Sequence, residues 1–216
     1  MQRIGAEVET KSFIERLKDD RMIAAIKDPK SFDRFIESDL QSAFLLMGNI
    51  SVIKRYVDKL KKHDRHVFLH IEKIPGISYD KEGLKFISKF VKPTGIVTTK
   101  SSLIQLAKQE ELLTIQRLFL IDTDAVHNGL KSTKEIQPDA LEVMPGLIPE
   151  MIQQLKKETD LPLITGGLIQ NTSHIEQALA SGAEAVSTGR SWLWKKYDYD
   201  FRRSEEHEKS RIEERF

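Results

Sequence analysis

Residues 140–188 hold three short apolar runs at nearly equal spacing: ALEVM at 140–144, PLIT at 162–165 and AVST at 185–188. Five earlier runs continue this spacing towards the N-terminus, at residues 22–26, 43–47, 66–71, 95–99 and 117–121. The starts of neighbouring runs lie 21 to 29 residues apart. Runs of this length at this spacing are typical of strands that alternate with helices.

The segments between the runs have helical periodicity, as residues 50–63 illustrate with Ile53, Val57 and Leu60 on one stripe. Strict alternation with such short crossovers implies parallel strands, and eight strand–helix units make a (β/α)8 barrel. We therefore predict an α/β fold, a compact TIM-type barrel with short loops. A doubly wound open sheet is the alternative, but its Gly-rich first turn is missing, because the first run continues as AAIKDP at 24–29.

The predicted barrel forms a single domain over residues 22–200. Residues 1–21 precede the first strand, and we expect Phe13, Ile14 and Leu17 to close the bottom of the barrel as a short helix. Residues 201–216 form a charged C-terminal tail in which Arg and Lys alternate with Glu, as a solvated helix or a frayed end.

Composition excludes several classes of protein. The 216 residues include no Cys, which rules out disulfide frameworks, Cys-ligated zinc sites and thiol nucleophiles. A net charge of +1 argues against a protein that coats nucleic acid over its whole surface. The apolar runs are too short to span a membrane, and residues 1–20 lack the apolar core of a signal peptide. We expect a soluble, cytoplasmic protein without a membrane partner.

Ionisable residues gather at or just beyond the C-terminal ends of the predicted strands, which is where TIM barrels carry their sites. They are Lys27, His70, Glu72, Lys100, Asp122 and Glu142. Some of them could instead cap helices or form ion pairs at the rim, and for Asp122 a helix cap is the main alternative. Glu142 lies between Leu141 and Val143, where burying a carboxylate without a partner is costly.

The last two strands end in glycine. The seventh ends on Gly166 and Gly167, and the eighth on Thr188-Gly189-Arg190. Glycine lets backbone N–H groups approach an anion, and phosphate-binding barrels use these two loops. Both loops could also be plain turns. Together with the ionisable mouth, they favour a small polyol or sugar phosphate as the ligand.

Several stretches together resemble the glycerol-3-phosphate-responsive antiterminators, which are regulators of glycerol uptake operons in Gram-positive bacteria. The stretches are AAIK at 24–27, VFLHIE at 67–72, GIVTTK at 95–100, QRLFLID at 116–122, PDALEVMPG at 138–146 and TGGLI at 165–169. The resemblance covers nearly all of the barrel and implies an antitermination factor that binds glycerol 3-phosphate and acts on leader mRNA. The family's pattern usually lacks an arginine at the place of Arg190.

An RNA-binding surface can be placed at two basic segments. The first is residues 54–65, where Lys54, Arg55, Lys59 and Lys62 are the candidate contacts. The second begins at residue 192, and its candidate contacts are Trp194, Lys195 and Lys196. An aromatic ring next to basic side chains suits stacking on unpaired nucleotides. Alternatively, the first segment is the solvated face of a helix, and the Trp pair packs the last helix onto the sheet.

The alternative function is a phosphate-binding barrel enzyme that acts on a small polyol or sugar phosphate as a phosphodiesterase, isomerase or transferase. Phosphodiesterases of this kind need a His-Arg-Gly turn after the first strand, where this chain has Lys27-Asp28-Pro29. We therefore favour a regulator with no catalytic residues, metal or cofactor, and with glycerol 3-phosphate as its effector. The sequence leaves the oligomeric state open, a homo-oligomer included.

Overall fold

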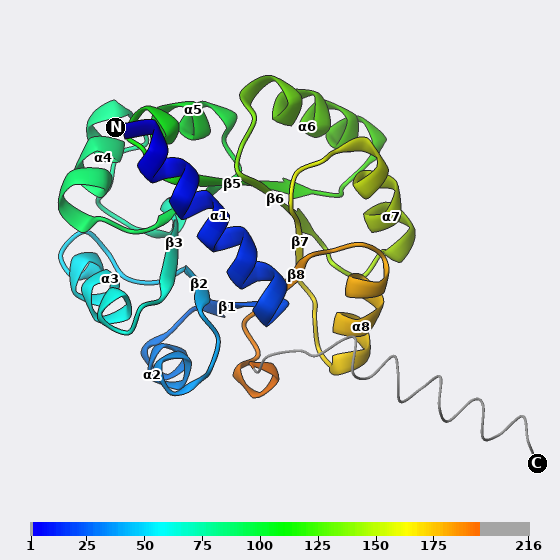
Figure 1. Ribbon diagram of the computed structural model, residues 1–216, viewed down its shortest axis with the longest axis horizontal. Coiled ribbons are helices and arrows are strands. Elements are labelled where there is room, and N and C mark those ends of the chain that lie inside the picture. Colours follow the sequence, from blue (N-terminus) through cyan, green and yellow to red (C-terminus); the bar gives the residue numbers. More distant parts are fainter. Residues whose placement is uncertain (1, 195–216) are drawn as a thin grey trace, which may run out of the picture.

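The computed structural model describes residues 2–194, and the side chains of residues 10–194. Its eight strands are β1 (Met22–Ile26), β2 (Ser42–Leu45), β3 (His66–His70), β4 (Gly95–Thr98), β5 (Leu113–Phe119), β6 (Ala140–Met144), β7 (Leu163–Gly166) and β8 (Ala185–Thr188). They pair in parallel and in chain order, and β8 pairs with β1 to close the ring. The predicted (β/α)8 TIM-type barrel is confirmed (Figure 1).

Helices surround the ring and connect each strand to the next (Figure 1). They are α2 (Pro29–Glu37), α3 (Ile53–Lys62), α4 (Lys81–Phe86), α5 (Ser101–Gln109), α6 (Thr123–Ile136), α7 (Pro149–Glu158) and α8 (Thr172–Ala180), with short helical turns η1 (Ile71–Lys73), η2 (Ile87–Val91) and η3 (Ser191–Leu193). Among residues 2–194, no helix combines the length and the apolar character needed to cross a membrane.

The barrel has two apolar layers because side chains alternate along each strand. Outward side chains such as Leu69 and Val143 pack against the helices. Inward side chains such as Phe44, Phe68 and Ile164 fill the barrel itself. Both layers are sealed from water, so polar side chains that point inward must find partners inside the barrel or at its open end.

Strand β5 begins earlier than the sequence pattern predicted. The apolar pattern predicts a strand at residues 117–121, whereas β5 spans Leu113–Phe119 and ends before Leu120 and Ile121. Thr114 and Gln116 obscure the apolar pattern, although both are buried. The shift makes Arg117 an interior residue of the strand, paired in register with Glu142 of β6.

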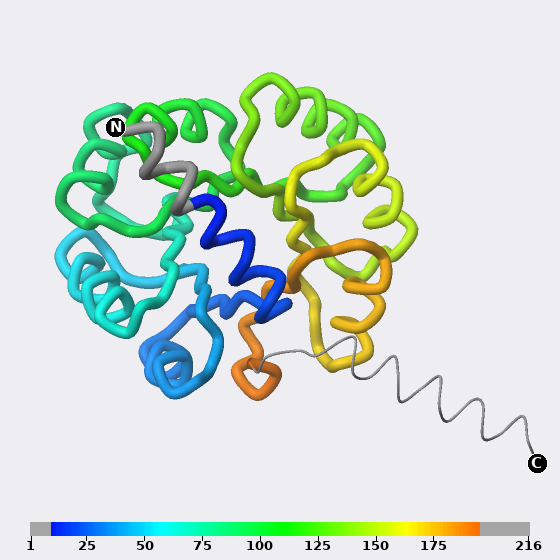
Figure 2. The backbone as a smooth tube through the Cα atoms, viewed as in Figure 1, coloured from blue at the N-terminus to red at the C-terminus, as the bar shows by residue number. Residues whose placement is uncertain are grey.

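Helix α1 (Gln2–Asp20) lies across the end of the barrel where the strands begin (Figure 1), and Figure 2 shows its second half, the part drawn in blue, over the ring. Phe13 and Leu17 are buried and belong to the interior layer. The ring of Phe13 lies 4.6 Å from that of Phe68 in β3, centroid to centroid. Arg16 pairs with Asp64, just before β3, at 2.8 Å. Because α1 covers this end, the opposite end is the open one.

We predict that Phe13→Ala lowers the free energy of unfolding by about 3–5 kcal/mol, because it leaves a cavity at a fully packed position. Urea unfolding of the variant should show a lower midpoint with an unchanged slope. The matched control is Lys18→Ala, an exposed position of the same helix, which should change stability by less than about 0.5 kcal/mol. Equal losses in the two variants would contradict the role of α1 as a packed cover.

Candidate functional site

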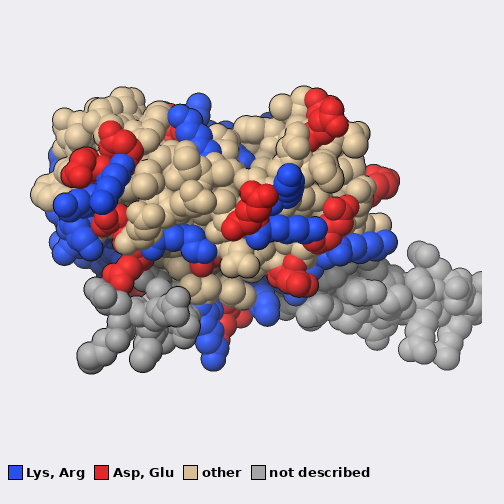
Figure 3. Space-filling view, turned by 90° about the horizontal axis from the view of Figure 1, so that it is seen from above, with Lys and Arg blue, Asp and Glu red and all other residues tan. Residues whose placement is uncertain are grey.

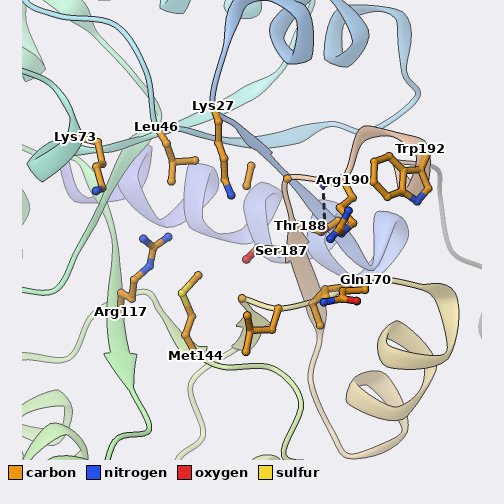
Figure 4. Close-up of a pocket in the computed structure, with 15 residues that line it drawn as sticks. Lys27, Leu46, Lys73, Arg117, Met144, Gln170, Ser187, Thr188, Arg190 and Trp192 are labelled. Atoms are coloured by element: carbon orange, nitrogen blue, oxygen red, sulfur yellow. Dashed lines mark hydrogen bonds between the residues drawn. The ribbon is translucent and has the colours of Figure 1, made fainter.

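A cavity of about 840 Å³ lies at the open end of the barrel, among the loops that follow the strands (Figure 4). Of the described residues that line it, four are cationic: Lys27, Lys73, Arg117 and Arg190. Figure 4 shows Lys27, Lys73 and Arg117 directed into the same space. No carboxylate lines the cavity within the described part of the chain. An anion is therefore the ligand that this arrangement favours.

Arg117 is held by a carboxylate buried beneath the cavity. Its Nε donates to Oε2 of Glu142 at 2.6 Å, and the hydroxyl of Ser187 donates to Oε1 of Glu142 at 2.6 Å. Glu142 is completely buried and Arg117 is 5% exposed. The Nε atom faces the carboxylate, so the terminal nitrogens of the guanidinium extend towards the cavity (Figure 4).

Gly166 makes this arrangement possible. A Cβ atom at this position would lie 2.1 Å from Oγ of Ser187 and 3.0 Å from Oε1 of Glu142. Any other residue would displace the Ser187–Glu142 hydrogen bond. Gly166 therefore leaves the space that the Ser187–Glu142 hydrogen bond occupies, and it does not itself line the cavity.

The neighbouring loops bring backbone close to the cavity. Gly167 has φ +75° and is followed by Leu168 at φ +60°, so the chain turns sharply here. A Cβ atom at Gly189 would lie 3.2 Å from Nζ of Lys27. A lysine amine and glycine backbone thus lie side by side, an arrangement that suits an anion.

His70 and Glu72 form a second polar cluster beside Arg117. Nδ1 of His70 lies 3.5 Å from Oε2 of Glu72, and both atoms are buried without a hydrogen-bond partner in the structure. Burial, together with the nearby Arg117 charge, lowers the pKa of His70 to about 4. Burial raises the pKa of Glu72, but hydrogen bonds from the Thr98 hydroxyl and from backbone amides outweigh it and lower that pKa.

The two remaining ionisable candidates lie away from the cavity. Lys100 places Nζ 4.4 Å from the ring centroid of Tyr79. Asp122 caps α6 by accepting a hydrogen bond from the backbone N–H of Ala125 at 2.7 Å. It lines a separate groove of about 360 Å³ beside α6 and α7.

Five of the eleven predicted ligand residues therefore line the cavity: Lys27, Gly167, Thr188, Gly189 and Arg190. Sequence reasoning missed Lys73, Arg117 and Ser187, which also line it. Arg117 could have been found from the alternation of Leu113, Ile115 and Arg117 once β5 is started at Leu113. Lys73 ends the short turn η1, for which the sequence carries no comparable pattern.

The basic residues predicted to contact RNA lie on the outer face of α3. Lys54 pairs with Asp58 at 2.8 Å and Lys59 with Asp33 at 3.7 Å, whereas Arg55 and Lys62 are exposed. On the side of the barrel that carries α5 and α6, Lys and Arg are interspersed with Asp and Glu (Figure 3). The described surface in that view has no continuous basic face.

Trp194 is buried, so its ring is not open to stacking by a nucleotide. Its Nε1 donates to the backbone oxygen of Thr188 at 2.8 Å, and its ring packs edge-on against Phe35. Trp192, by contrast, is 65% exposed. Lys195, Lys196 and the predicted tail at 201–216 lie outside the described residues.

Comparison with known proteins identifies the family. The glycerol-3-phosphate responsive antiterminators match residues 22–194 of this chain. The chain belongs to this family. Antiterminators are regulatory proteins, which confirms the prediction of a regulator related to glycerol. Among residues 10–194, whose side chains the structure describes, no group of three or more His, Asp or Glu side chains is placed to hold a metal ion.

Two solved structures resemble this antiterminator over most of its length. The glycerol uptake operon antiterminator regulatory protein of Listeria monocytogenes is 34% identical, with a TM-score of 0.77, covering 80% of this chain and 94% of that one. The glycerol uptake operon antiterminator-related protein of Thermotoga maritima is 26% identical, with a TM-score of 0.71, covering 80% and 96%.

A third relative, YgcP of Escherichia coli K12, is described as uncharacterized and is 32% identical over 82% of this chain and 93% of its own length. Orotidine 5′-phosphate decarboxylase of Pyrococcus horikoshii, at 15% identity and a TM-score of 0.59, shares the barrel fold.

We predict that the antiterminator loses stability as the pH falls from about 6.5 towards about 4. Burial lowers the pKa of both His66 and His70 to about 4 in the folded protein, whereas the same two side chains have a pKa of 6.5 in the unfolded chain. Between these values the unfolded state binds more protons, so acid favours unfolding. Urea midpoints measured at about pH 7.5 and about pH 5 should differ less in His70→Gln than in the wild type. An identical difference in both proteins would contradict the neutral, buried state of His70.

Proposed function

We propose that this antiterminator binds glycerol 3-phosphate at the open end of its barrel and, in that state, acts on leader mRNA. The observation that carries the proposal is the cavity with four cations and no lining carboxylate among the described residues. The family is described as responsive to glycerol 3-phosphate, so we take glycerol 3-phosphate to be the anion.

We assign the phosphate to the side of the cavity formed by Lys27, Gly167, Gly189 and Arg190. This is where the loops after the seventh and eighth strands meet, the usual phosphate site of such barrels. Lysine and arginine donate charge-assisted hydrogen bonds, and glycine lets the backbone approach the phosphate oxygens. Arg117 reaches the same space from β5, with an orientation set by Glu142.

We assign the glycerol hydroxyls to the side towards His70 and Glu72. Neither residue lines the cavity, but Nδ1 of His70 and Oε2 of Glu72 lie buried 3.5 Å apart and make no hydrogen bond, and such atoms in native proteins usually await a water or a ligand. Glu72 is ionised, so Oε2 is an acceptor for a hydroxyl proton.

We expect the antiterminator to bind RNA from the leader of the glycerol uptake operon more tightly with glycerol 3-phosphate present than without it. Linkage then requires the RNA to raise ligand affinity by the same factor. Anisotropy titrations of labelled RNA, with ligand absent and saturating, measure the first effect, and calorimetry with and without RNA measures the second. Glycerol alone should have no effect, because it lacks the phosphate. Equal RNA affinities with and without ligand would contradict the proposal.

The ligand site is tested in the same titrations by Lys27→Met. We expect glycerol 3-phosphate to bind at least about tenfold more weakly, the loss typical of one charge-assisted hydrogen bond. The matched control is Lys30→Met, an exposed lysine three residues along the chain that does not line the cavity. Equal ligand affinities in the two variants would place the phosphate elsewhere.

A further inference from the structure

Two exposed aromatic rings stand at the rim of the open end. Trp192 lies in η3, after β8, and is 65% exposed. Tyr79 lies between β3 and α4 and is 43% exposed. A single exposed aromatic ring is common on protein surfaces, so what distinguishes these two rings is their place at the open end of the barrel, where the cationic cavity lies. Within the described part of the chain, neither ring is covered by another element.

A positively charged side chain lies over each ring. The guanidinium carbon of Arg190 lies 4.9 Å from the ring centroid of Trp192, and Nζ of Lys100 lies 4.4 Å from that of Tyr79. Lys100 follows β4 and Arg190 follows β8, which are four positions apart in a closed ring of eight strands. The two cation–aromatic pairs therefore stand on opposite sides of the open end, with the cationic cavity between them.

We propose that a single strand of RNA lies across the open end, with one base stacked at Trp192 and another at Tyr79. This inference rests on the proposed function and names the RNA-contacting surface. Aromatic rings interleaved with cations are the usual platform for unpaired nucleotides, because rings stack on bases and cations neutralise phosphates. Lys73 lines the cavity between the two platforms and is the cation that we assign to the phosphates of the crossing strand, whereas Lys27 is assigned to the phosphate of the small ligand.

Charge favours RNA over a protein partner at this surface. Of the carboxylates near this surface, Glu142 is bound by Arg117 and Ser187, and Glu72 accepts from Thr98 and Thr99. Asp80, next to Tyr79, is exposed and caps α4 by accepting from the backbone N–H of Gly83. Two copies of this chain facing each other would bring two sets of cavity cations together. A polyanion meets no such repulsion.

Room in the cavity also supports this placement. A volume of about 840 Å³ lies in the range that holds drug-sized molecules and exceeds what one glycerol phosphate fills. Arg190 both lines the cavity and holds the ring of Trp192. Ligand and RNA would thus share one side chain, which gives a direct physical route for coupling between them.

The chain's own tryptophans test this inference. There are two, and Trp192 is exposed whereas Trp194 is buried. The probe is random-sequence single-stranded RNA of about 12 nucleotides, added with saturating glycerol 3-phosphate. We expect the RNA to quench the emission of the wild type, because a stacked base quenches an indole. In Trp192→Phe, most of the affinity should remain while the quenching disappears.

Affinity measurements on alanine variants complete the test. Trp192→Ala and Tyr79→Ala should each weaken RNA binding at least about fivefold, the lower end for loss of one stacked base. Tyr79 does not line the cavity, so Tyr79→Ala should bind glycerol 3-phosphate as the wild type does. The matched control is Phe90→Ala, a 53% exposed ring beside Lys54 on the outer wall, which should leave RNA affinity unchanged. Thermal unfolding checks that each variant folds.

Three results would overturn the inference, and they differ in what they leave standing. If only reversal of charge at Arg55 and Lys62 abolishes RNA binding, the RNA lies on α3 and the proposed function survives. If Trp192→Ala changes the oligomeric state and not the RNA affinity, the rim is a protein interface. If the wild type binds neither this RNA nor leader RNA, with or without ligand, the proposed function fails as well.

Discussion

The buried pair between Arg117 and Glu142 is the constraint on which the open end of the barrel depends. The two residues are register partners on β5 and β6, so the strand pairing itself brings them together. A carboxylate sealed from water must be neutralised, and here a guanidinium and the Ser187 hydroxyl from β8 do so. Gly166 on β7 leaves the room they need. Four strands thus converge on one carboxylate. Such a pair contributes little to stability by itself, and its effect is to fix the direction of Arg117.

That direction links the interior of the fold to its surface. Beneath the pair lies the apolar interior that α1 closes, and above it lies a cavity with cations from three further segments. The rim adds Trp192 and Tyr79, each beside a cation. In our account, the cavity binds glycerol 3-phosphate and the rim binds RNA. Arg190 belongs to both surfaces, so each ligand alters the environment of the other.

The sequence predicted the fold because the spacing of apolar runs is a property of the backbone topology. It also singled out Glu142, since a lone carboxylate in an apolar run demands a partner. The partner itself was missed because Thr114 and Gln116 disguise the start of β5, and the direction of Arg117 depends on where that strand begins. The prediction that Trp194 stacks on nucleotides also fails, because Trp194 is buried and Trp192 is the exposed ring. The three-residue turn η3 determines which of the two rings faces the protein interior. So short a segment has no periodicity from which the sequence could predict this. Asp122 has the same sequence context as a ligand and as a helix cap, and here it caps α6.

The most direct test of the role of Glu142 is the affinity of Glu142→Leu for glycerol 3-phosphate, measured by calorimetry beside Glu142→Gln. Leucine removes the group that orients Arg117, whereas glutamine keeps an oxygen that can accept from Nε of Arg117. If Glu142 positions Arg117, Glu142→Leu binds the ligand at least about tenfold more weakly although a negative charge has been removed, and Glu142→Gln stays closer to the wild type. If both variants bind more tightly than the wild type, the carboxylate only competes with phosphate for the guanidinium, and the account is contradicted.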